Sequence, residues 1–255
     1  MKVVCLGAGR LAYQLMPALE EAGCSVLQVY NRKIESAKSL SEKLQSSSFT
    51  STVSEIIADA DAYFLVVSDD AVKSVAEDLH KIIHKDALVI HCSGILDLDV
   101  LPFKRKAGFY PLQSFSLNYD VSWRYIPVII TTNDDDIWIT LDQIAGKMSS
   151  AVYRMTDHQK SILHIAAVFA NNFSNHMLAV AEKICNEHQL PFEILKPLIL
   201  ETFSKAIIAG PVGSQTGPAV RGDQKTIEKH LALLKDHAGL KDLYKRISES
   251  IKAES

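Results

Sequence analysis

The chain has 255 residues, of which 47% are hydrophobic and 22% charged, and its formal net charge is −3 at pH 7. A chain of this length and composition can bury a substantial core, which excludes an intrinsically disordered protein. The slight negative charge gives no sign of the basic face that binding to nucleic acid requires.

The four cysteines stand singly among apolar neighbours, and the sequence contains neither a CxxC pair nor a Cys/His ligand spacing. We therefore predict reduced, buried thiols and no metal site. The first residues lack the charged head and long apolar stretch of a signal peptide, and no apolar run is long enough to span a bilayer. We expect a cytoplasmic protein that interacts with neither membranes nor nucleic acids.

Short β-rich runs alternate with helical patterns through the first 155 residues. Such alternation is typical of right-handed βαβ units around a parallel sheet. We therefore predict an α/β, Rossmann-like domain over residues 1–155. The expected strands are 2–7, 25–30, 62–67, 87–92, 126–131 and 150–155, and the expected helices are 10–23, 34–44, 70–85 and 133–148.

After residue 155 the β signal disappears. The segment 157–189 could form one long helix, and 191–210 begins with proline and ends at Gly210, as a helix does. A loop at 211–223 precedes further helical patterns at 224–237 and 240–253. We predict a separate, all-helical domain over residues 156–255.

A glycine-rich turn, Gly7-x-Gly9-x-x-Ala12, joins the first strand to the first helix. In this setting the glycines let a pyrophosphate approach the backbone, and the helix N-terminus presents unpaired N–H groups to the phosphates. Ordinary strand–helix turns also contain glycine pairs, but the complete β–turn–α–β context favours dinucleotide binding. The residues that we assign to the cofactor here are Gly7, Ala8, Gly9, Arg10 and Leu11.

The second strand ends on Asn31-Arg32, where an NAD-binding chain of this fold would place a carboxylate for the ribose 2′-hydroxyl. Asn31 is neutral, and Arg32 offers a planar cation suited to bidentate contact with a 2′-phosphate. Lys33 adds a second positive charge. A solvated basic turn is the alternative, but these charges favour NADP (NADPH) over NAD.

Three further segments follow strands, at the sheet edge where ligands of open parallel sheets bind. They are 66–72, 91–94 and 109–115. In the first, we assign three residues to the cofactor: Val67, Ser68 and Asp69. Asp69 and Asp70 are also expected to cap the following helix. Ser93 could face the nicotinamide or could be an ordinary turn serine, and Tyr110 is a candidate for substrate binding.

The helical half offers a polar ridge. His164, Val168 and Asn172 recur at i, i+4 and i+8, with Asn171 and Asn175 beside them. Because buried amides need hydrogen-bond partners, these side chains could line a cleft between the domains and hold a substrate, or could join helices in a polar core network.

The loop "TGPAVRGD" (216–223) is the other unusual feature of the helical half. Asp223 can cap the following helix. Arg221 could capture a substrate carboxylate, or could simply belong to the loop that enters the helix.

The order of the motifs GAGR, NR, VSDDAV, HCSG, PLQSF, FANNF and TGPAVRGD resembles a bacterial family of NADP oxidoreductases. Its members join a Rossmann-like domain to a helical carboxyl-terminal domain of unknown function, DUF2520. The resemblance covers nearly the whole chain, and TGP-x-x-RGD is its most specific part. More distantly, the chain is similar to pyrroline-5-carboxylate reductase and the β-hydroxyacid dehydrogenases, which implies a homodimer formed through the helical domain.

Two positions depart from these relatives. Tyr110-Pro111-Leu112 stands where many members of the family have His-Pro-Leu, so no histidine can act there. The catalytic lysine of the β-hydroxyacid dehydrogenases has no counterpart near "FANNF". The resemblance therefore implies the cofactor and leaves the reaction open.

Two functions follow. The first is an NADP-dependent oxidoreductase that moves hydride between NADP(H) and a small carbonyl or imine substrate in the cleft between the domains. His164 would donate the proton, Asn172 and Ser93 would orient the substrate, and Tyr110, Asn171 and Arg221 would contact it. The alternative is a non-catalytic, NADP-binding sensor or partner protein that dimerises through its helical domain. The sequence does not decide the substrate, the reaction direction, or whether a deazaflavin replaces the nicotinamide.

Overall fold

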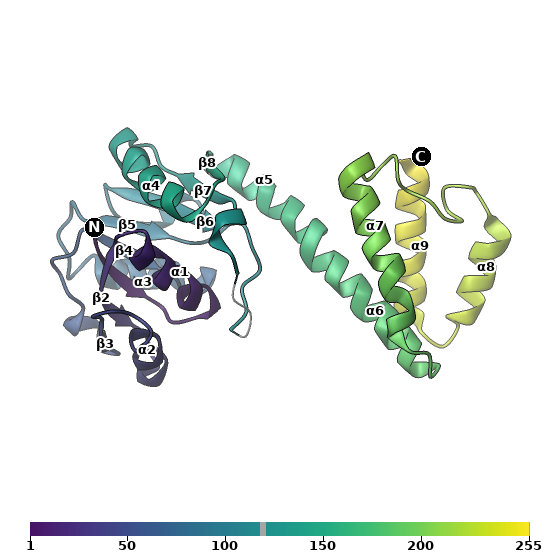
Figure 1. Ribbon diagram of the computed structural model, residues 1–255, viewed down its shortest axis with the longest axis horizontal. Helices are drawn as coiled ribbons and strands as arrows, with labels where there is room; N and C mark the ends of the chain where they lie inside the picture. Colours follow the sequence, from purple (N-terminus) through teal and green to yellow (C-terminus); the bar gives the residue numbers. More distant parts are fainter. Residues whose placement is uncertain (118–120, 255) are drawn as a thin grey trace. The chain divides into compact units, whose positions relative to one another are not determined.

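The computed structural model describes residues 1–117 and 121–254 and divides into two compact units, Met1–Ser174 and Asn175–Ser255 (Figure 1). The first unit includes the helix and the π-helical segment that lead to residue 174, which the sequence assigned to the helical domain. A division into compact units does not fix the boundary between the Rossmann-like domain and the helical domain. The boundary at 155/156 therefore stays a prediction.

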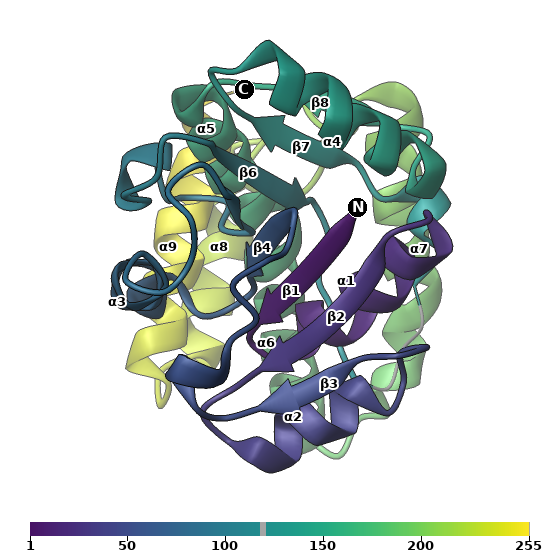
Figure 2. The same ribbon diagram turned by 90° about the vertical axis from the view of Figure 1, so that its left-hand side faces the viewer.

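The first unit contains an eight-stranded sheet with the order β3-β2-β1-β4-β5-β6-β7-β8 (Figure 2). Neighbouring strands are parallel except for β6 and β7, which are antiparallel. The α/β prediction is therefore confirmed. The strands are β1 (Lys2–Leu6), β2 (Ser25–Tyr30), β3 (Ser48–Thr50), β4 (Ala62–Leu65), β5 (Leu88–His91), β6 (Lys106–Pro111), β7 (Val128–Thr131) and β8 (Val152–Arg154).

Helices connect these strands close to the predicted positions. The first of them buries Leu15 and Leu19, which lie one turn apart on the same face. It ends before Gly23, whose φ of +93° suits glycine and whose N–H donates to Glu20 O at 2.9 Å. The helices of this unit are α1 (Arg10–Glu21), α2 (Ile34–Ser41), α3 (Asp69–Leu79), α4 (Asp135–Met148) and α5 (Asp157–Ala167).

Both faces of the sheet are buried. Along β4, Phe64 belongs to the core on one face, where it meets Phe109 edge-to-face at 5.8 Å between ring centroids. Tyr63 and Leu65 belong to the core on the other face. Each buried large apolar side chain stabilises the fold by about 1.5–3 kcal/mol. Strands buried on both faces produce the continuous apolar runs that made them predictable.

Two strands were not predicted. β3 is an edge strand that pairs only with β2, and Phe49 at its centre is exposed. An edge strand of this kind needs no buried apolar face, and the serine-rich sequence therefore lacks the apolar alternation that would predict a strand. β6 contains Gly108 and ends on Pro111, residues that normally argue against a strand. The expected ligand-edge segment 109–115 therefore starts inside β6, and Tyr110 lies on a strand.

The cysteine prediction is confirmed, because Cys5, Cys24, Cys92 and Cys185 are all buried and free. Burial raises the pKa of the Cys5 and Cys92 thiols, so both stay neutral.

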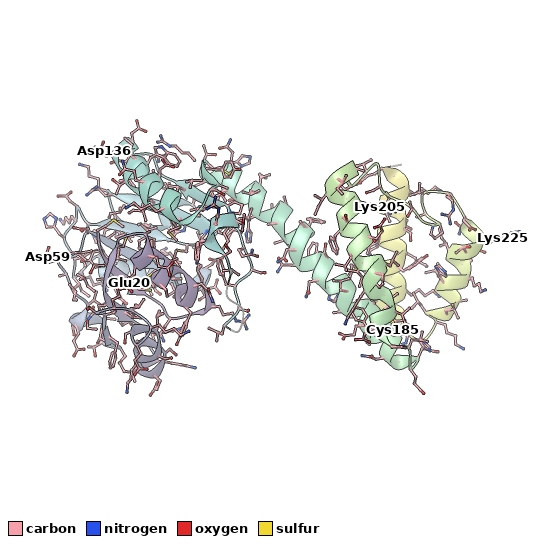
Figure 3. All side chains as sticks on the ribbon, viewed as in Figure 1. Glu20, Asp59, Asp136, Cys185, Lys205 and Lys225 are labelled. Carbon is pink, nitrogen blue, oxygen red and sulfur yellow. The ribbon has the colours of Figure 1, made fainter. Side chains whose placement is uncertain are left out.

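The second unit is helical, as predicted. The backbone is helical without a break from α5 through a π-helical segment, η4 (Val168–Phe173), into α6 (Ser174–Glu187). Cys185 on α6 is buried, whereas none of residues 196–209 is. Figure 3 labels Cys185, together with Lys205 on α7 and Lys225 on α8. The other helices are α7 (Lys196–Ala209), α8 (Gln224–Leu233) and α9 (Ala238–Ala253).

Candidate functional site

The glycine turn lies between β1 and α1. Gly7 has φ +117°, and a Cβ there would lie 2.1 Å from Val66 O, so only glycine fits. Its N–H donates to Tyr30 O at 2.8 Å, which joins the ends of β1 and β2. Gly9 is the N-cap of α1, and no described atom lies within 4 Å of the position of its Cβ. The N-terminus of α1 is therefore open to an anionic group.

The predicted NADP determinant follows β2. The side-chain amide of Asn31 donates to Lys33 O at 3.0 Å, and its backbone N–H donates to Thr50 O at 3.1 Å. These bonds hold the turn, while Arg32 and Lys33 are exposed. Neither cation forms an ion pair within residues 1–117 and 121–254. Both charges are therefore available to a phosphate.

The segment after β4 corrects one prediction. Ser68 is the N-cap residue of α3, and no side chain caps this helix. Asp69 and Asp70 lie in the first turn, one and two positions beyond the N-cap residue, so neither caps the helix. Their negative charges still favour the positive end of the helix dipole. Val67 is half-buried, and Ser68 and Asp69 are exposed, which leaves both polar side chains accessible.

Ser93, after β5, is buried and makes a turn. Its hydroxyl accepts the N–H groups of Ile95 and Leu96 at 3.2 and 3.1 Å, and its own N–H donates to His91 Nδ1 at 3.2 Å. These contacts are those of an ordinary turn serine, which is one of the two roles considered for Ser93. A role toward a nicotinamide stays a prediction.

A tyrosine–histidine pair forms the centre of the candidate active site. Tyr110 Oη on β6 lies 3.0 Å from His164 Nδ1 on α5, and the rings meet edge-to-face at 5.8 Å between centroids. Gly94 lies against both, because a Cβ there would lie 2.5 Å from His164 Nδ1 and 2.8 Å from Tyr110 Cζ. Burial raises the pKa of Tyr110, and the negative charge of Asp69 raises it further. The phenol is therefore protonated at neutral pH.

This pair lines a cavity of about 600 Å³, which is large enough for a small organic molecule. Gln113, Asn171 and Asn172 add amides, and small or aliphatic side chains form most of the remaining wall. Among the described residues that line it, none is Asp, Glu, Lys or Arg. The cavity can therefore offer hydrogen bonds and one tyrosine–histidine proton donor, without a fixed charge.

The π-helical segment changes the predicted polar ridge. Its wider turn replaces the regular spacing expected for His164, Val168 and Asn172, and both Asn171 and Asn172 line the cavity. Both amides are exposed, so a buried polar core network is the wrong description of them. Asn175, also exposed, belongs to the second unit.

The loop before α8 lies in the second unit. The Asp223 side chain accepts the N–H of Thr226 at 3.1 Å, which confirms the predicted helix cap. Hydrogen bonds from Thr226 lower the pKa of Asp223. Arg221 is exposed, and a contact with substrate stays a prediction.

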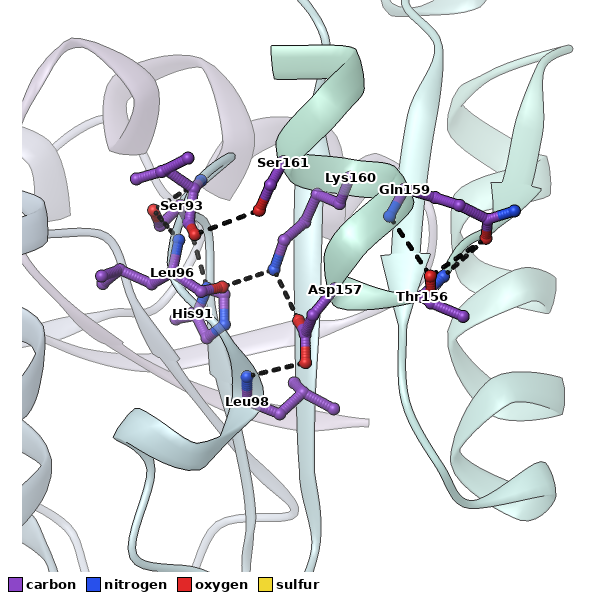
Figure 4. A network of polar contacts seen from close by, with 10 residues as sticks. His91, Ser93, Leu96, Leu98, Thr156, Asp157, Gln159, Lys160 and Ser161 are labelled. Carbon is purple, nitrogen blue, oxygen red and sulfur yellow. Dashed lines mark hydrogen bonds and ion pairs between the residues drawn. The ribbon is translucent and has the colours of Figure 1, made fainter. Parts of the chain in front are cut away.

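A buried ionic network beside the pair was missed by the sequence analysis (Figure 4). Lys160 is 0% exposed, and its Nζ donates to Leu96 O at 2.6 Å and to Asp157 Oδ1 at 3.0 Å. Lysine is almost never fully buried without a partner, so a single lysine in a sequence suggests a solvated side chain. The capping box of Thr156 and Gln159 marks where α5 begins. That box, with the Asp157-x-x-Lys160 spacing, was the available signal.

His91 belongs to the same region. Burial lowers its pKa to about 3, and the charge of Lys160 adds to this effect. Because Ser93 N–H donates to Nδ1, a neutral His91 carries its proton on Nε2, which has no hydrogen-bond partner among the described residues. The imidazole is therefore neutral at physiological pH.

Within residues 1–117 and 121–254, no group of three or more His, Cys, Asp or Glu side chains could hold a metal ion. In that same part of the chain, no helix is both long and apolar enough to cross a membrane.

Comparisons with known proteins agree with this architecture. Residues 2–94 match the family model "NADP oxidoreductase coenzyme F420-dependent", and residues 126–251 match the domain of unknown function DUF2520. The crystal structure of the putative NADP oxidoreductase BF3122 from Bacteroides fragilis is similar over 99% of this chain and 98% of that chain. The sequence identity is 34% and the TM-score is 0.91. The chain matches no curated protein.

Two more distant structures share the fold. An imine reductase from Myxococcus stipitatus in complex with NADP⁺ is 14% identical, with a TM-score of 0.74 over 99% of this chain and 95% of that chain. A pyrroline-5-carboxylate reductase from Coxiella burnetii is 17% identical, with a TM-score of 0.57 over 98% and 96%. At these identities the similarity shows the fold alone.

The sheet with its glycine turn, taken with these matches, defines a Rossmann-like protein of the oxidoreductase class. The chain belongs to the same family as BF3122, and its own sequence matches the NADP oxidoreductase model followed by the DUF2520 model. The resemblance inferred from the order of the motifs is confirmed.

Proposed function

We propose that the protein is an NADP-dependent oxidoreductase that transfers hydride between NADP(H) and a small carbonyl or imine substrate. The observation that carries the proposal is the hydrogen-bonded Tyr110–His164 pair, which lines a cavity in the unit that bears the glycine turn. Family membership supports the cofactor, and the imine reductase of similar fold was determined with NADP⁺.

The cofactor would bind at the turn of Gly7 and Gly9, with its pyrophosphate at the N-terminus of α1. Arg32 and Lys33 would receive the 2′-phosphate, because both are exposed and unpaired in the described part of the chain. NADP(H) supplies the hydride acceptor or donor, and every other function of the site falls to side chains of the protein.

Reduction of a carbonyl places negative charge on its oxygen, which must receive a proton. The Tyr110 hydroxyl and the His164 ring form one donor unit, since they are 3.0 Å apart and Tyr110 is protonated at neutral pH. A protonated imine already carries its proton and becomes a neutral amine on receiving hydride. Asn171 and Asn172 would orient either substrate from the cavity wall.

The proposal is tested by measuring NADPH binding and turnover separately. We expect the wild type to bind NADPH and to oxidise it with at least one member of a panel of small carbonyls and cyclic imines. The variants Tyr110→Phe and His164→Ala should bind NADPH normally and lose about 10²–10⁴-fold in carbonyl reduction. Tight NADPH binding without turnover of any panel member would instead indicate the non-catalytic sensor.

We also propose that the protein forms a homodimer through its second unit. The helix α7 is apolar on several sides, yet Leu198, Leu200, Phe203, Ile207 and Ile208 are between 43% and 83% exposed. A helix of this composition is normally covered, and the more distant families that the chain resembles dimerise through this domain. Light scattering should give a dimer for the wild type and a monomer for Ile207→Glu/Ile208→Glu. A monomeric wild type would contradict the proposal.

A further inference from the structure

The first two turns of α5 are attached to the loop 93–98, which follows β5 (Figure 4). Three side chains of α5 bond to the backbone of this loop, at residues 95, 96 and 98. The bonds run from Ser161 Oγ to Ile95 O (3.3 Å), from Lys160 Nζ to Leu96 O (2.6 Å), and from Leu98 N to Asp157 Oδ2 (3.1 Å). The helix and the loop therefore have one defined register.

Lys160 is the central and most deeply buried member of this set. Its side chain is 0% exposed, whereas the side chain of Asp157 is 27% exposed. A buried ammonium group requires acceptors in good geometry, because transfer from water is very unfavourable without them. Leu96 O and Asp157 Oδ1 are the acceptors here. Any movement of α5 along the loop would break these bonds, so this register is strongly preferred.

His164 lies one helical turn after Lys160, on the same side of α5. The loop reaches the same point from the other direction, because Gly94 lies against both His164 and Tyr110. The 3.0 Å contact between Tyr110 and His164 thus depends on three elements: β6, α5 and the loop 93–98. Lys160 joins two of the three.

We propose that Lys160 is a positioning residue that fixes α5 against the loop 93–98 and thereby keeps His164 within hydrogen-bond distance of Tyr110. Its importance for turnover rests on the proposed oxidoreductase function, while its effect on the pair does not. Lys160 does not line the cavity, and both contacts of its ammonium group are with protein atoms, so it has no direct part in the chemistry.

The chain offers a matched control. Asp78 on α3 and Lys81, two residues after that helix ends, have the same i, i+3 spacing as Asp157 and Lys160, with a similar Oδ1–Nζ distance of 2.8 Å. Their side chains are 52% and 72% exposed. The variants to compare are therefore Asp157→Asn/Lys160→Met and Asp78→Asn/Lys81→Met. Each removes both charges of a pair, and in the buried pair the asparagine oxygen can still accept Leu98 N–H.

The decisive readout is the ¹⁵N chemical shift of His164 Nδ1, which reports its hydrogen bond to Tyr110. In the wild type and in the surface control, Tyr110→Phe should change this shift by the same amount. In Asp157→Asn/Lys160→Met the change should fall below half of that amount, while NADPH affinity stays within twofold. An undiminished change would overturn the proposal, even if the variant were less stable, because a merely structural role would leave the pair intact.

A turnover measurement links the inference to function. With any substrate that the wild type reduces, Asp157→Asn/Lys160→Met should lower kcat by about 10²-fold, as expected for a displacement of about 1 Å. If the wild type reduced no substrate, the proposed function would fail and the NMR comparison would still decide the role of Lys160. If the double variant did not fold, Asp157→Asn alone keeps the bond to Leu96. It should reduce the response to Tyr110→Phe partially, and an unaltered response would count against the proposal.

Discussion

The carboxyl edge of the sheet carries two polar regions, one with exposed, unpaired charges and one with a buried, paired charge. After β1 and β2, Arg32 and Lys33 are exposed and the N-terminus of α1 is open. After β5 and beside β6, Lys160 is fully buried and bonded to protein acceptors. Exposed, unpaired charged groups can interact favourably with a ligand, whereas buried, paired groups hold the surrounding elements in fixed positions. We infer that the first region provides affinity and the second provides alignment.

The largest expected effect concerns pH and the buried region. The pKa of His91 is lowered from 6.5 to about 3, so the folded state binds fewer protons than the unfolded state between these values. His91 makes its full contribution to the free energy of unfolding above pH 6.5. This contribution, about 5 kcal/mol in total, is lost as pH falls toward 3. Urea unfolding between pH 4 and pH 7 should show this slope. In His91→Asn, whose side-chain oxygen can still accept Ser93 N–H, an equally steep slope would refute the assignment.

Breaking the buried ion pair on one side should have the next largest effect. Lys160→Met leaves Asp157 without its partner and should reduce the free energy of unfolding by about 3–5 kcal/mol. The surface variant Lys81→Met, in the matched exposed pair, should leave it unchanged within error. Denaturant unfolding of both variants checks the difference. Equal effects would show that burial does not distinguish the two pairs.

The two glycines of the turn separate fold from ligand binding. Gly7→Ala introduces backbone strain of about 1–2 kcal/mol at φ +117° and a clash with Val66 O that costs about 1–3 kcal/mol more. Gly9→Ala meets no described atom within 4 Å, so its stability should match the wild type. Its added methyl group should nevertheless weaken NADPH binding, which calorimetry measures. Normal NADPH affinity in Gly9→Ala would argue against a pyrophosphate at this turn.

The smallest expected effect is at the exposed cation. Arg32→Ala should lose about 1.5–3 kcal/mol of NADPH binding, or about 10–150-fold in Kd, because a charge-assisted contact with the 2′-phosphate disappears. NADH binding should stay the same, and so should the melting temperature. An equal loss for NADH and NADPH would remove Arg32 from the recognition of the 2′-phosphate.

The two regions also differ in how well the sequence predicts them. The glycine turn and the Asn31-Arg32 strand end are local patterns, and their neighbours in space are nearby in sequence or at equivalent strand ends. Their positions follow once the βαβ order is recognised. The strands themselves were predictable because their apolar runs are buried on both sides of the sheet.

The pairing of Tyr110 with His164 was not predictable, although both residues were candidates. It depends on β6, whose glycine and proline conceal the strand, and on a helix fifty-four positions further along the chain. Lys160 was missed because a lysine between polar neighbours indicates solvent, and only tertiary contacts bury it. The sequence "VFANNF" contains no pattern from which we could predict a π-helix, so the altered spacing of His164, Val168 and Asn172 was not foreseen.

The most direct test of the central claim follows the hydride itself. NADPH carrying deuterium at nicotinamide C4 would be incubated with the wild type and a panel of small carbonyls and cyclic imines, and products analysed by mass spectrometry. The account predicts deuterium on the former carbonyl or imine carbon, at a rate lowered by His164→Ala for carbonyls. Deuterium that never leaves a tightly bound cofactor, with any member of the panel, would contradict it.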